Sequence, residues 1–429
     1  MCVLKSHKIL TVVFSLEKGG TERAAQNFAF GYSDIGNDSR LLYTRSDGIR
    51  GAYLKQRNIP VYALSDNDDI SCLCEWSPSV VHLHSHGITV EEFSKIKKLF
   101  PNARYIETNV FSRPSPWVDQ VELSFQLSYW CAWLYRKRSK KKYPSVVIPN
   151  PIGTSVFQFS GNDRVKSFRA SHGINVGDIV IGRVGQHFDG KWSPVLIDIF
   201  ESLRDTTTNL KLLIVNPSES IISRTKDSPY HKDIIHIEQI NGDSNLADCY
   251  SSIDVFVLIA DQGESFGMVL AESLLCQTPV VTLATPWGDN SQGEVVGNRI
   301  GGFVAANKKD ILGRVYKLIE DKSLRDQMGL AGRNRIIELY DSKNVASDAL
   351  SSIHSITKRE KACPLPLDLM RDTEGRLSLL SKLILGSERG FSFLRFSTGY
   401  HSALEMPRFI ANAAVKRLLR LFGIRRGQI

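Results

Sequence analysis

Two consecutive blocks of alternating strand-like and helix-like segments leave few folds open to this chain of 429 residues. In the first block, short apolar runs predict strands over Ile9–Leu16, Arg40–Thr44, Val61–Leu64, Val80–His84, Arg104–Glu107 and Val146–Ile148. Asn150-Pro151 interrupts the pattern, which resumes with strands over Ile179–Val184, Leu210–Val215, Ile234–Ile237, Asp254–Ala260, Pro279–Leu283 and Gly302–Val304. Helix-like segments lie between the strands, so both blocks predict parallel sheets covered on both faces.

The fold class that follows is α/β, with two doubly wound, Rossmann-like domains that face each other across a cleft. We expect the first domain to span residues 1–152 and the second residues 153–340. A crossing helix is expected over residues 341–358, followed by a basic amphipathic tail over residues 359–429.

The positive charge of the chain is concentrated in that tail. Residues 358–429 hold 14 Lys and Arg against 6 Asp and Glu, so they carry +8 of the net charge of +9. The nearly neutral remainder argues against a nucleic-acid-binding protein. The segment from Phe409 to Arg426 is typical of a basic helix that lies on an anionic membrane, and a helix docked on the protein is the alternative. The aromatic and cationic run Tyr129–Lys142 is compatible with a membrane contact or with a core helix and a charged loop.

The cysteines and the apolar segments indicate a cytoplasmic protein. The chain has 7 scattered cysteines without the spacing of zinc ligands, which is typical of a reducing compartment. No run is long and apolar enough to span a bilayer. We therefore expect a cytoplasmic protein that is peripherally associated with the inner face of the cell membrane through its tail.

Two carboxylates, Glu264 and Glu272, flank a Phe-Gly turn. The surrounding pattern predicts strand, loop, helix, turn and strand, so Glu264 follows the carboxyl end of a parallel strand and Glu272 lies in the next helix. Ligands bind at this edge of open α/β sheets. Two acidic acceptors there suit the hydroxyls of a sugar or a ribose, although a solvated helix start would also explain them.

Two further loops carry groups that bind phosphate. Gly19 and Gly20 open the first helix, where glycine allows close backbone approach and free N–H groups bind anions. Arg183 and Lys191 follow the corresponding strand of the second block and bring two cations to the sheet edge. An ordinary tight turn and two surface bases are the alternatives.

Histidines end the fourth strand of the first block, at His82, His84 and His86. Because no carboxylate or cysteine accompanies them, a polar active-site imidazole is favoured over a metal site. His84 and His86 both remain candidates, and His82 suits a core histidine.

Taken together and in this order, these segments resemble the retaining glycosyltransferases of family 4, which have the GT-B fold. The resemblance covers roughly residues 8–357 and is strongest at Glu264–Glu272, which is similar to the E-x7-E motif of that family. Gly19–Arg23 resembles the G-G-x-E-R loop of the family, and Thr285–Asn290 with Glu294 resembles a further donor-side loop.

The resemblance implies roles for individual residues. It implies that donor contacts are made by Gly19 and Gly20 at the phosphates, Arg183 and Lys191 at the diphosphate, Glu264 at the sugar hydroxyls, Ser265, Phe266, Gly267 and Met268 beside the sugar, and Glu272 at the ribose. It also implies that His84 contacts the transferring sugar, so that the catalytic set is His84, Arg183, Lys191 and Glu264. No metal or other cofactor is implied, and the anomeric configuration of the sugar would be retained.

The expected function is transfer of a sugar from a nucleotide-diphosphate donor to a growing glycan or glycolipid, as in lipopolysaccharide, capsule or related polysaccharide synthesis. The expected partners are the nucleotide sugar, a glycan or lipid-linked acceptor and an anionic membrane, without nucleic acid. A GT-B sugar phosphorylase or phosphosugar synthase and a catalytically silent glycan- or membrane-binding scaffold stay open as alternatives. An NAD-dependent oxidoreductase is disfavoured because the G-x-G-x-x-G fingerprint is absent.

Overall fold

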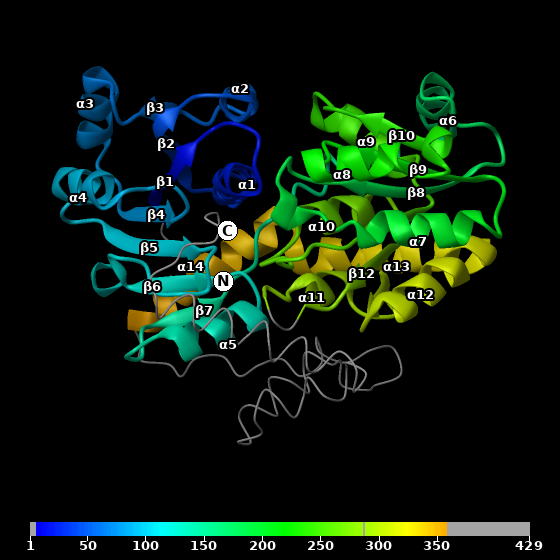
Figure 1. Cartoon of the computed structure of the whole chain (residues 1–429). Helices are drawn as coiled ribbons and strands as arrows, with labels where there is room; N and C mark the ends of the chain where they lie inside the picture. Colours follow the sequence, from blue (N-terminus) through cyan, green and yellow to red (C-terminus); the bar gives the residue numbers. More distant parts are fainter. Residues whose placement is uncertain (1–5, 286–287, 358–429) are drawn as a thin grey trace.

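The computed structural model of the chain describes residues 6–285 and 288–357. Two lobes lie side by side, and each is built on one parallel sheet with helices packed around it (Figure 1). The predicted α/β class with two parallel sheets is therefore confirmed. The predicted basic tail, residues 359–429, lies outside the described residues.

The first lobe holds a 7-stranded parallel sheet with the order β3-β2-β1-β4-β5-β6-β7. Its strands are β1 (Lys8–Ser15), β2 (Asp38–Ser46), β3 (Val61–Ala63), β4 (Val80–His84), β5 (Arg104–Asn109), β6 (Leu123–Gln126) and β7 (Ser145–Val147). Its helices are α1 (Gly20–Asp34), α2 (Ile49–Gln56), α3 (Asn67–Trp76), α4 (Val90–Leu99), the short η1 (Val118–Gln120) and α5 (Tyr129–Arg138). Strand β6 is missing from the sequence-based prediction.

The second lobe holds a 6-stranded parallel sheet with the order β10-β9-β8-β11-β12-β13. Its strands are β8 (Ile179–Val184), β9 (Leu210–Val215), β10 (Ile234–Ile237), β11 (Val255–Leu258), β12 (Val280–Leu283) and β13 (Gly302–Ala305). Its helical segments are α6 (Asn162–Ser171), η2 (Asp189–Lys191), α7 (Val195–Arg204), α8 (Glu219–Lys226), η3 (His231–Asp233), α9 (Asp243–Ser251), α10 (Met268–Leu275), α11 (Gln292–Val296), α12 (Lys308–Glu320) and α13 (Lys322–Tyr340).

Within the residues that the structure describes, the chain crosses between the lobes at two places, and these two crossings lie together. The backbone N–H of Ile152 donates to the carbonyl oxygen of Tyr340 at 2.7 Å. Helix α14 (Ser342–Thr357) then packs along α1, and its apolar residues join the core of the first lobe (Figure 1). The helices approach closely at Gly31, where an added Cβ would lie 2.3 Å from the carbonyl oxygen of Ser342. Helix α14 therefore connects the second lobe to the first.

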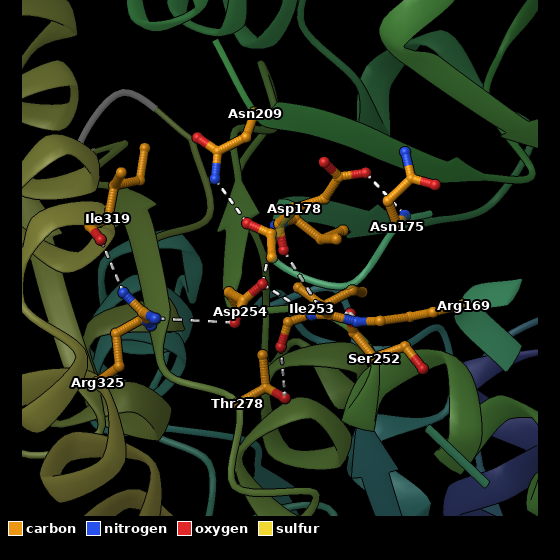
Figure 2. A network of polar contacts seen from close by, with 12 residues as sticks. Arg169, Asn175, Asp178, Asn209, Ser252, Ile253, Asp254, Thr278, Ile319 and Arg325 are labelled. Carbon is orange, nitrogen blue, oxygen red and sulfur yellow. Dashed lines mark hydrogen bonds and ion pairs between the residues drawn. The ribbon is translucent and has the colours of Figure 1, made fainter. Parts of the chain in front are cut away.

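A polar network surrounds Asp254 at the amino end of β11 (Figure 2). Asp254 directly precedes β11, and its Oδ2 accepts hydrogen bonds from the Val180 backbone N–H at 2.8 Å and from Arg169 at 2.7 Å. Arg169 also donates to the carbonyl oxygens of Asp178 and Ser252. Charge-assisted bonds of this kind fix the position of a strand end, so we assign the network a structural role.

The strand orders place the predicted site segments at the two points where the sheets change winding direction. Those points lie between β1 and β4 in the first sheet and between β8 and β11 in the second. In doubly wound sheets the crevice outside the carboxyl ends of such strands is the usual ligand site. Gly19, His84, Lys191 and Glu264 all follow or end these strands.

Candidate active site

Lys191 and Glu264 meet at the carboxyl edge of the second sheet. The Nζ atom of Lys191 lies 2.8 Å from Oε2 of Glu264, and both side chains are largely withdrawn from solvent. Lys191 ends the short helix η2, and Glu264 lies in the loop between β11 and α10. The sequence-based prediction placed both residues at this edge, and the structure brings them into direct contact.

Two glycines with positive φ shape the loop that carries Glu264. Gly263 has φ +70°, and an added Cβ would lie 1.7 Å from the carbonyl oxygen of Asp289. Gly267 has φ +94° and precedes the first turn of α10. Because L side chains rarely adopt this conformation, glycine is required for the loop to pack against Thr285 and Asp289.

The residues between Glu264 and α10 face both lobes. The carbonyl oxygen of Ser265 accepts a hydrogen bond from Sγ of Cys131, in α5 of the first lobe, at 3.2 Å. Phe266 is buried, with its ring centroid 5.3 Å from that of Tyr340. Met268 begins α10 and lies against Gly20, where an added Cβ would be 3.6 Å from its Cγ. The predicted phosphate loop and the acidic loop therefore face each other across the cleft.

The backbone of Gly19 lies beside a carboxylate of its own helix. An added Cβ at Gly19 would lie 2.0 Å from Oε2 of Glu22, so the Glu22 side chain folds back over this loop. Gly20 begins α1, and its N-cap residue, Gly19, has an extended backbone and provides no side-chain hydrogen bond to the first turn. Such a helix start favours bound anions.

Arg183 is buried below the carboxyl edge of the second sheet and is not exposed on it. Its side chain is buried, and its guanidinium donates hydrogen bonds to the carbonyl oxygens of Val184 and Lys191. Burial lowers the pKa of this guanidinium from its usual value, although the nearby charge of Glu264 acts in the opposite direction. In this conformation Arg183 supports the segment that carries Lys191, and its predicted contact with a diphosphate stays a prediction.

Glu272 is bonded by residues from both lobes. Its Oε2 accepts a hydrogen bond from the hydroxyl of Tyr250 at 2.9 Å, and its Oε1 accepts one from Arg23 of the first lobe. Arg23 also pairs with Asp243 at 2.8 Å. Burial alone would lower the pKa of Arg23, but the charges of Glu272 and Asp243 raise it above the usual value. The carboxylate predicted to bind ribose is thus already engaged.

Arg23 lies in the G-G-x-E-R segment of the sequence, but no role was predicted for it, nor for Tyr250 or Asp243. The glycines that precede Arg23 predict a loop at the start of a helix. No residue near Arg23 in the sequence indicates that its partner lies in the other lobe. The pairing with Asp243 joins residues 220 positions apart.

His84 lies inside the first lobe. It is fully buried, and neither ring nitrogen has a hydrogen-bond partner among the described residues. Burial lowers its pKa to about 3, so the imidazole is neutral near pH 7. His82 has partners on both ring nitrogens, the hydroxyls of Tyr32 and Thr108, as a core histidine does. His86 is exposed and lies 5.4 Å from the ring of Phe111, so it stays the alternative active-site imidazole.

Glu294 of the second lobe binds the amino end of α5. Its carboxylate accepts hydrogen bonds from the backbone N–H groups of Tyr129 and Trp130, each at 2.9 Å. Hydroxyl groups of Ser128 and Ser291 share a further bond at 2.6 Å. The two backbone donors favour the charged form of Glu294 and lower its pKa. Burial has the larger effect and raises the pKa to about 7. This contact joins the predicted donor-side loop to the first lobe.

Within residues 6–285 and 288–357 no cluster of three or more His, Cys, Asp or Glu side chains could hold a metal ion. In the same ranges no helix has the length and apolarity needed to cross a membrane. The expected metal independence stays a prediction.

These features define a class of fold: two facing parallel sheets with a polar site between their carboxyl edges. Among solved structures, Anabaena HepE in complex with UDP and glucose has the same fold, with a TM-score of 0.66, 14% identity, and coverage of 81% of this chain and 100% of HepE. A glycosyltransferase from Rickettsia africae gives a TM-score of 0.67 at 16% identity, with coverage of 83% and 100%. At such identities the likeness shows the fold alone, which is that of GT-B glycosyltransferases.

Two sequence comparisons are more specific. Residues 165–335 match the family model described as Glycosyl transferases group 1. The capsular polysaccharide biosynthesis glycosyltransferase CapM of Staphylococcus aureus is 27% identical over 222 residues. The match covers 49% of this chain and 54% of CapM, so the chain spans about half the length of this curated relative. Together these matches support an enzyme of the transferase class.

Proposed function

We propose that this protein is a retaining, metal-independent glycosyltransferase that moves a sugar from a nucleotide-diphosphate donor to a growing glycan or glycolipid of the cell surface. One observation carries the proposal: Lys191, Glu264 and Glu272 lie along the carboxyl edge of the second sheet, opposite Gly20 at the start of α1. The group 1 family match and the similarity to CapM support the same class of reaction.

In this proposal the donor diphosphate lies between the start of α1 and Lys191. Negative charge develops on the diphosphate as the bond to the sugar breaks, and the Lys191 ammonium and the backbone N–H groups at the start of α1 stabilise that charge. Glu264 holds Lys191 at 2.8 Å and keeps acceptor capacity for sugar hydroxyls. Arg183 acts indirectly, because it bonds the Lys191 carbonyl oxygen from beneath.

The acceptor is proposed to bind on the first lobe, at the ends of β4 and β5. A neutral imidazole can donate and accept hydrogen bonds with sugar hydroxyls, and the low pKa of His84 keeps it in that form. His84 reaches the transferring sugar only after its surroundings open, whereas His86 is exposed already. Movement of the lobes would align donor and acceptor and exclude water.

The proposed acceptor is lipid-linked, and the proposed location is the inner face of the cell membrane. The net charge of the tail supports this, because anionic lipids attract basic segments. The second predicted basic segment is within the described residues, where Arg136, Lys137, Lys140 and Lys142 are exposed at the end of α5.

The decisive experiment measures release of nucleoside diphosphate from uridine, guanosine and adenosine diphosphate sugars, with and without a glycan or lipid-linked acceptor and with a chelator. Glu264→Gln and Lys191→Met should each lower turnover by about a hundredfold, the scale for losing one electrostatic stabiliser. Lys322→Met is the matched control, since it removes a Lys–Asp contact of 2.6 Å on the solvated surface. Near-native turnover in both cleft variants would reject the assigned roles.

The same assay separates the alternatives. A sugar phosphorylase would release no nucleoside diphosphate and would instead transfer a sugar from the glycan to added inorganic phosphate. A phosphosugar synthase would release nucleoside diphosphate only when a sugar phosphate is supplied as the acceptor. A scaffold would release no diphosphate from any donor, and Glu272→Ala would leave its nucleotide binding unchanged. For the membrane contact, deletion of residues 403–429 should release the protein from phosphatidylglycerol vesicles. Vesicle binding equal to that of the full chain would reject the proposed role of the tail.

A further inference from the structure

Arg23 reaches across the cleft from the first turn of α1 and binds two carboxylates of the second lobe. Its guanidinium donates to Oε1 of Glu272 and to Oδ1 of Asp243. The side chains of Arg23, Glu272 and Asp243 are only 11%, 4% and 16% exposed. Hydrogen bonds between charged groups that are largely buried are strong, so this contact controls whether a ligand can reach the carboxylate of Glu272.

Both oxygens of Glu272 have partners, but the two partners come from different lobes. Tyr250 is fully buried in the same lobe as Glu272 and bonds Oε2. Arg23 comes from the other lobe and covers Oε1, on the side that faces the first lobe. A ribose that donates its hydroxyls to Glu272 needs that side, so Arg23 is the partner that has to leave.

Three features allow Arg23 to leave Glu272 without becoming an isolated buried charge. Its ion pair with Asp243 uses a different guanidinium nitrogen and can persist. The ring centroid of Phe157 lies 5.0 Å from its guanidinium carbon, which adds a cation–π contact. Arg23, Asp243 and Glu272 also line one cavity of about 550 Å³ between the lobes, which provides room for a rotated side chain.

We propose that Arg23 occupies the ribose position on Glu272 in the ligand-free protein and that the donor nucleotide displaces it. The inference rests on the proposed function, because it assumes that a nucleotide binds at Glu272. The nucleotide competes with Arg23 for Glu272. Its apparent affinity is therefore the intrinsic affinity multiplied by the fraction of molecules in which Arg23 has left Glu272. Arg23 is thus a positioning residue that links donor affinity to the contact between the lobes.

Arg50 provides a matched control within the same cluster. It is also a buried guanidinium of the first lobe, and its NH1 group lies 3.1 Å from Oδ2 of Asp243. No hydrogen bond joins it to Glu272 among the described residues. Arg50→Gln therefore removes one cation between the lobes while leaving the proposed competitor in place.

The experiment measures dissociation constants by calorimetry for uridine, guanosine and adenosine diphosphates and for their uncharged nucleosides. For the base that the wild type binds, Arg23→Gln should tighten binding of diphosphate and nucleoside alike by about tenfold, within the usual range of coupling between sites. Arg50→Gln should change it by less than about twofold, below that range. Adding Glu272→Gln to Arg23→Gln should abolish the gain. Arg23→Lys, which keeps a charge but loses the planar fork, should give an intermediate affinity if Arg23→Gln does not fold.

Unchanged or weaker nucleoside binding in Arg23→Gln would overturn the inference while leaving the proposed function intact. Weaker binding of the diphosphate alone would assign Arg23 to the phosphates and would also overturn it. A gain that persists in the double variant would show that Glu272 is not the group for which Arg23 competes. Failure of the wild type to bind any of these nucleotides would reject the proposed function itself, together with the exchange.

Discussion

Protonation of Glu294 should stabilise the contact between the lobes, and Glu294→Gln makes this measurable. The carboxylate lies at the amino end of α5, where it accepts two backbone hydrogen bonds of 2.9 Å. Burial raises its pKa from the usual 4.5 to about 7. The folded protein therefore holds a proton that the unfolded chain releases between these two pH values.

The sign of the pH dependence follows from that shift. The contribution of the Glu294 proton to the free energy of unfolding is fully present below about pH 4.5, the usual pKa. It is lost as the pH rises through about 7, the pKa in the folded protein. A shift of this size corresponds to at most about 3 kcal/mol, and the remaining solvent contact of the side chain reduces this to about 2 kcal/mol.

The assay compares the melting temperature of the wild type and of Glu294→Gln from about pH 5 to about pH 8, the range in which the raised pKa acts. Glutamine does not titrate, so its cost is independent of pH, and other titrating groups cancel in the comparison. The wild type should lose about 4 to 8 °C relative to the variant across this range, on the scale for domains of ordinary size.

Glu92→Gln is the control for this measurement. Burial of Glu92 opposes its charge, but the hydrogen bond from the Thr89 backbone and other donors lower its pKa below the usual value. Its titration therefore lies below the tested range, and the difference between this variant and the wild type should stay constant. If the melting temperatures of Glu294→Gln and of the wild type changed in parallel with pH, the reasoning about Glu294 would be refuted.

Three substitutions test the packing. Asp254→Ala removes the acceptor shared by the Val180 N–H and Arg169, and it should lower the free energy of unfolding by about 2 kcal/mol, measured by urea denaturation. Gly263→Ala places a methyl group 1.7 Å from a backbone oxygen of the facing loop, so nucleotide binding measured by calorimetry should weaken strongly while the far-ultraviolet circular dichroism spectrum is kept. Gly31→Val should push α14 away from α1 and lower the melting temperature by several degrees, because the added Cβ meets backbone 2.3 Å away.

The apolar runs predict nearly every strand because the central parallel strands, such as β4, β8 and β11, are buried on both faces. Strand β6 escapes this pattern since two of its buried residues are polar. The hydroxyl of Ser124 donates to Glu107 on the neighbouring strand at 2.9 Å, and Gln126 donates to Ser124 at 3.0 Å. Ser124 can be buried because Glu107, in another segment, satisfies its hydroxyl, and the β6 segment alone does not indicate that partner.

The place of the candidate site could be predicted better than its internal contacts. Glycines and carboxylates next to apolar runs predict which sheet edge carries Gly20, Glu264 and Glu272, because the carboxyl ends of parallel strands share one edge. The direction of the Arg183 side chain depends on carbonyl oxygens in a folded loop, and the pairing of Arg23 depends on the relative position of the lobes. The local pattern of apolar and polar residues therefore predicts neither the direction of Arg183 nor the partner of Arg23.

The contacts between the lobes differ in character at α5 and at α1, and this difference indicates where the lobes separate most easily. At α5, Leu127 and Cys131 of the first lobe join the buried apolar cluster of the second, so separation would expose apolar surface to water at a free-energy cost proportional to its area. At α1, Arg23 and Glu272 form an ionic contact whose groups find new partners in water or in a ligand. Opening at α1 would uncover Glu272 for a nucleotide while Glu294 stays docked on α5. A ligand that replaces Arg23 therefore opens the donor side without undoing the apolar contact.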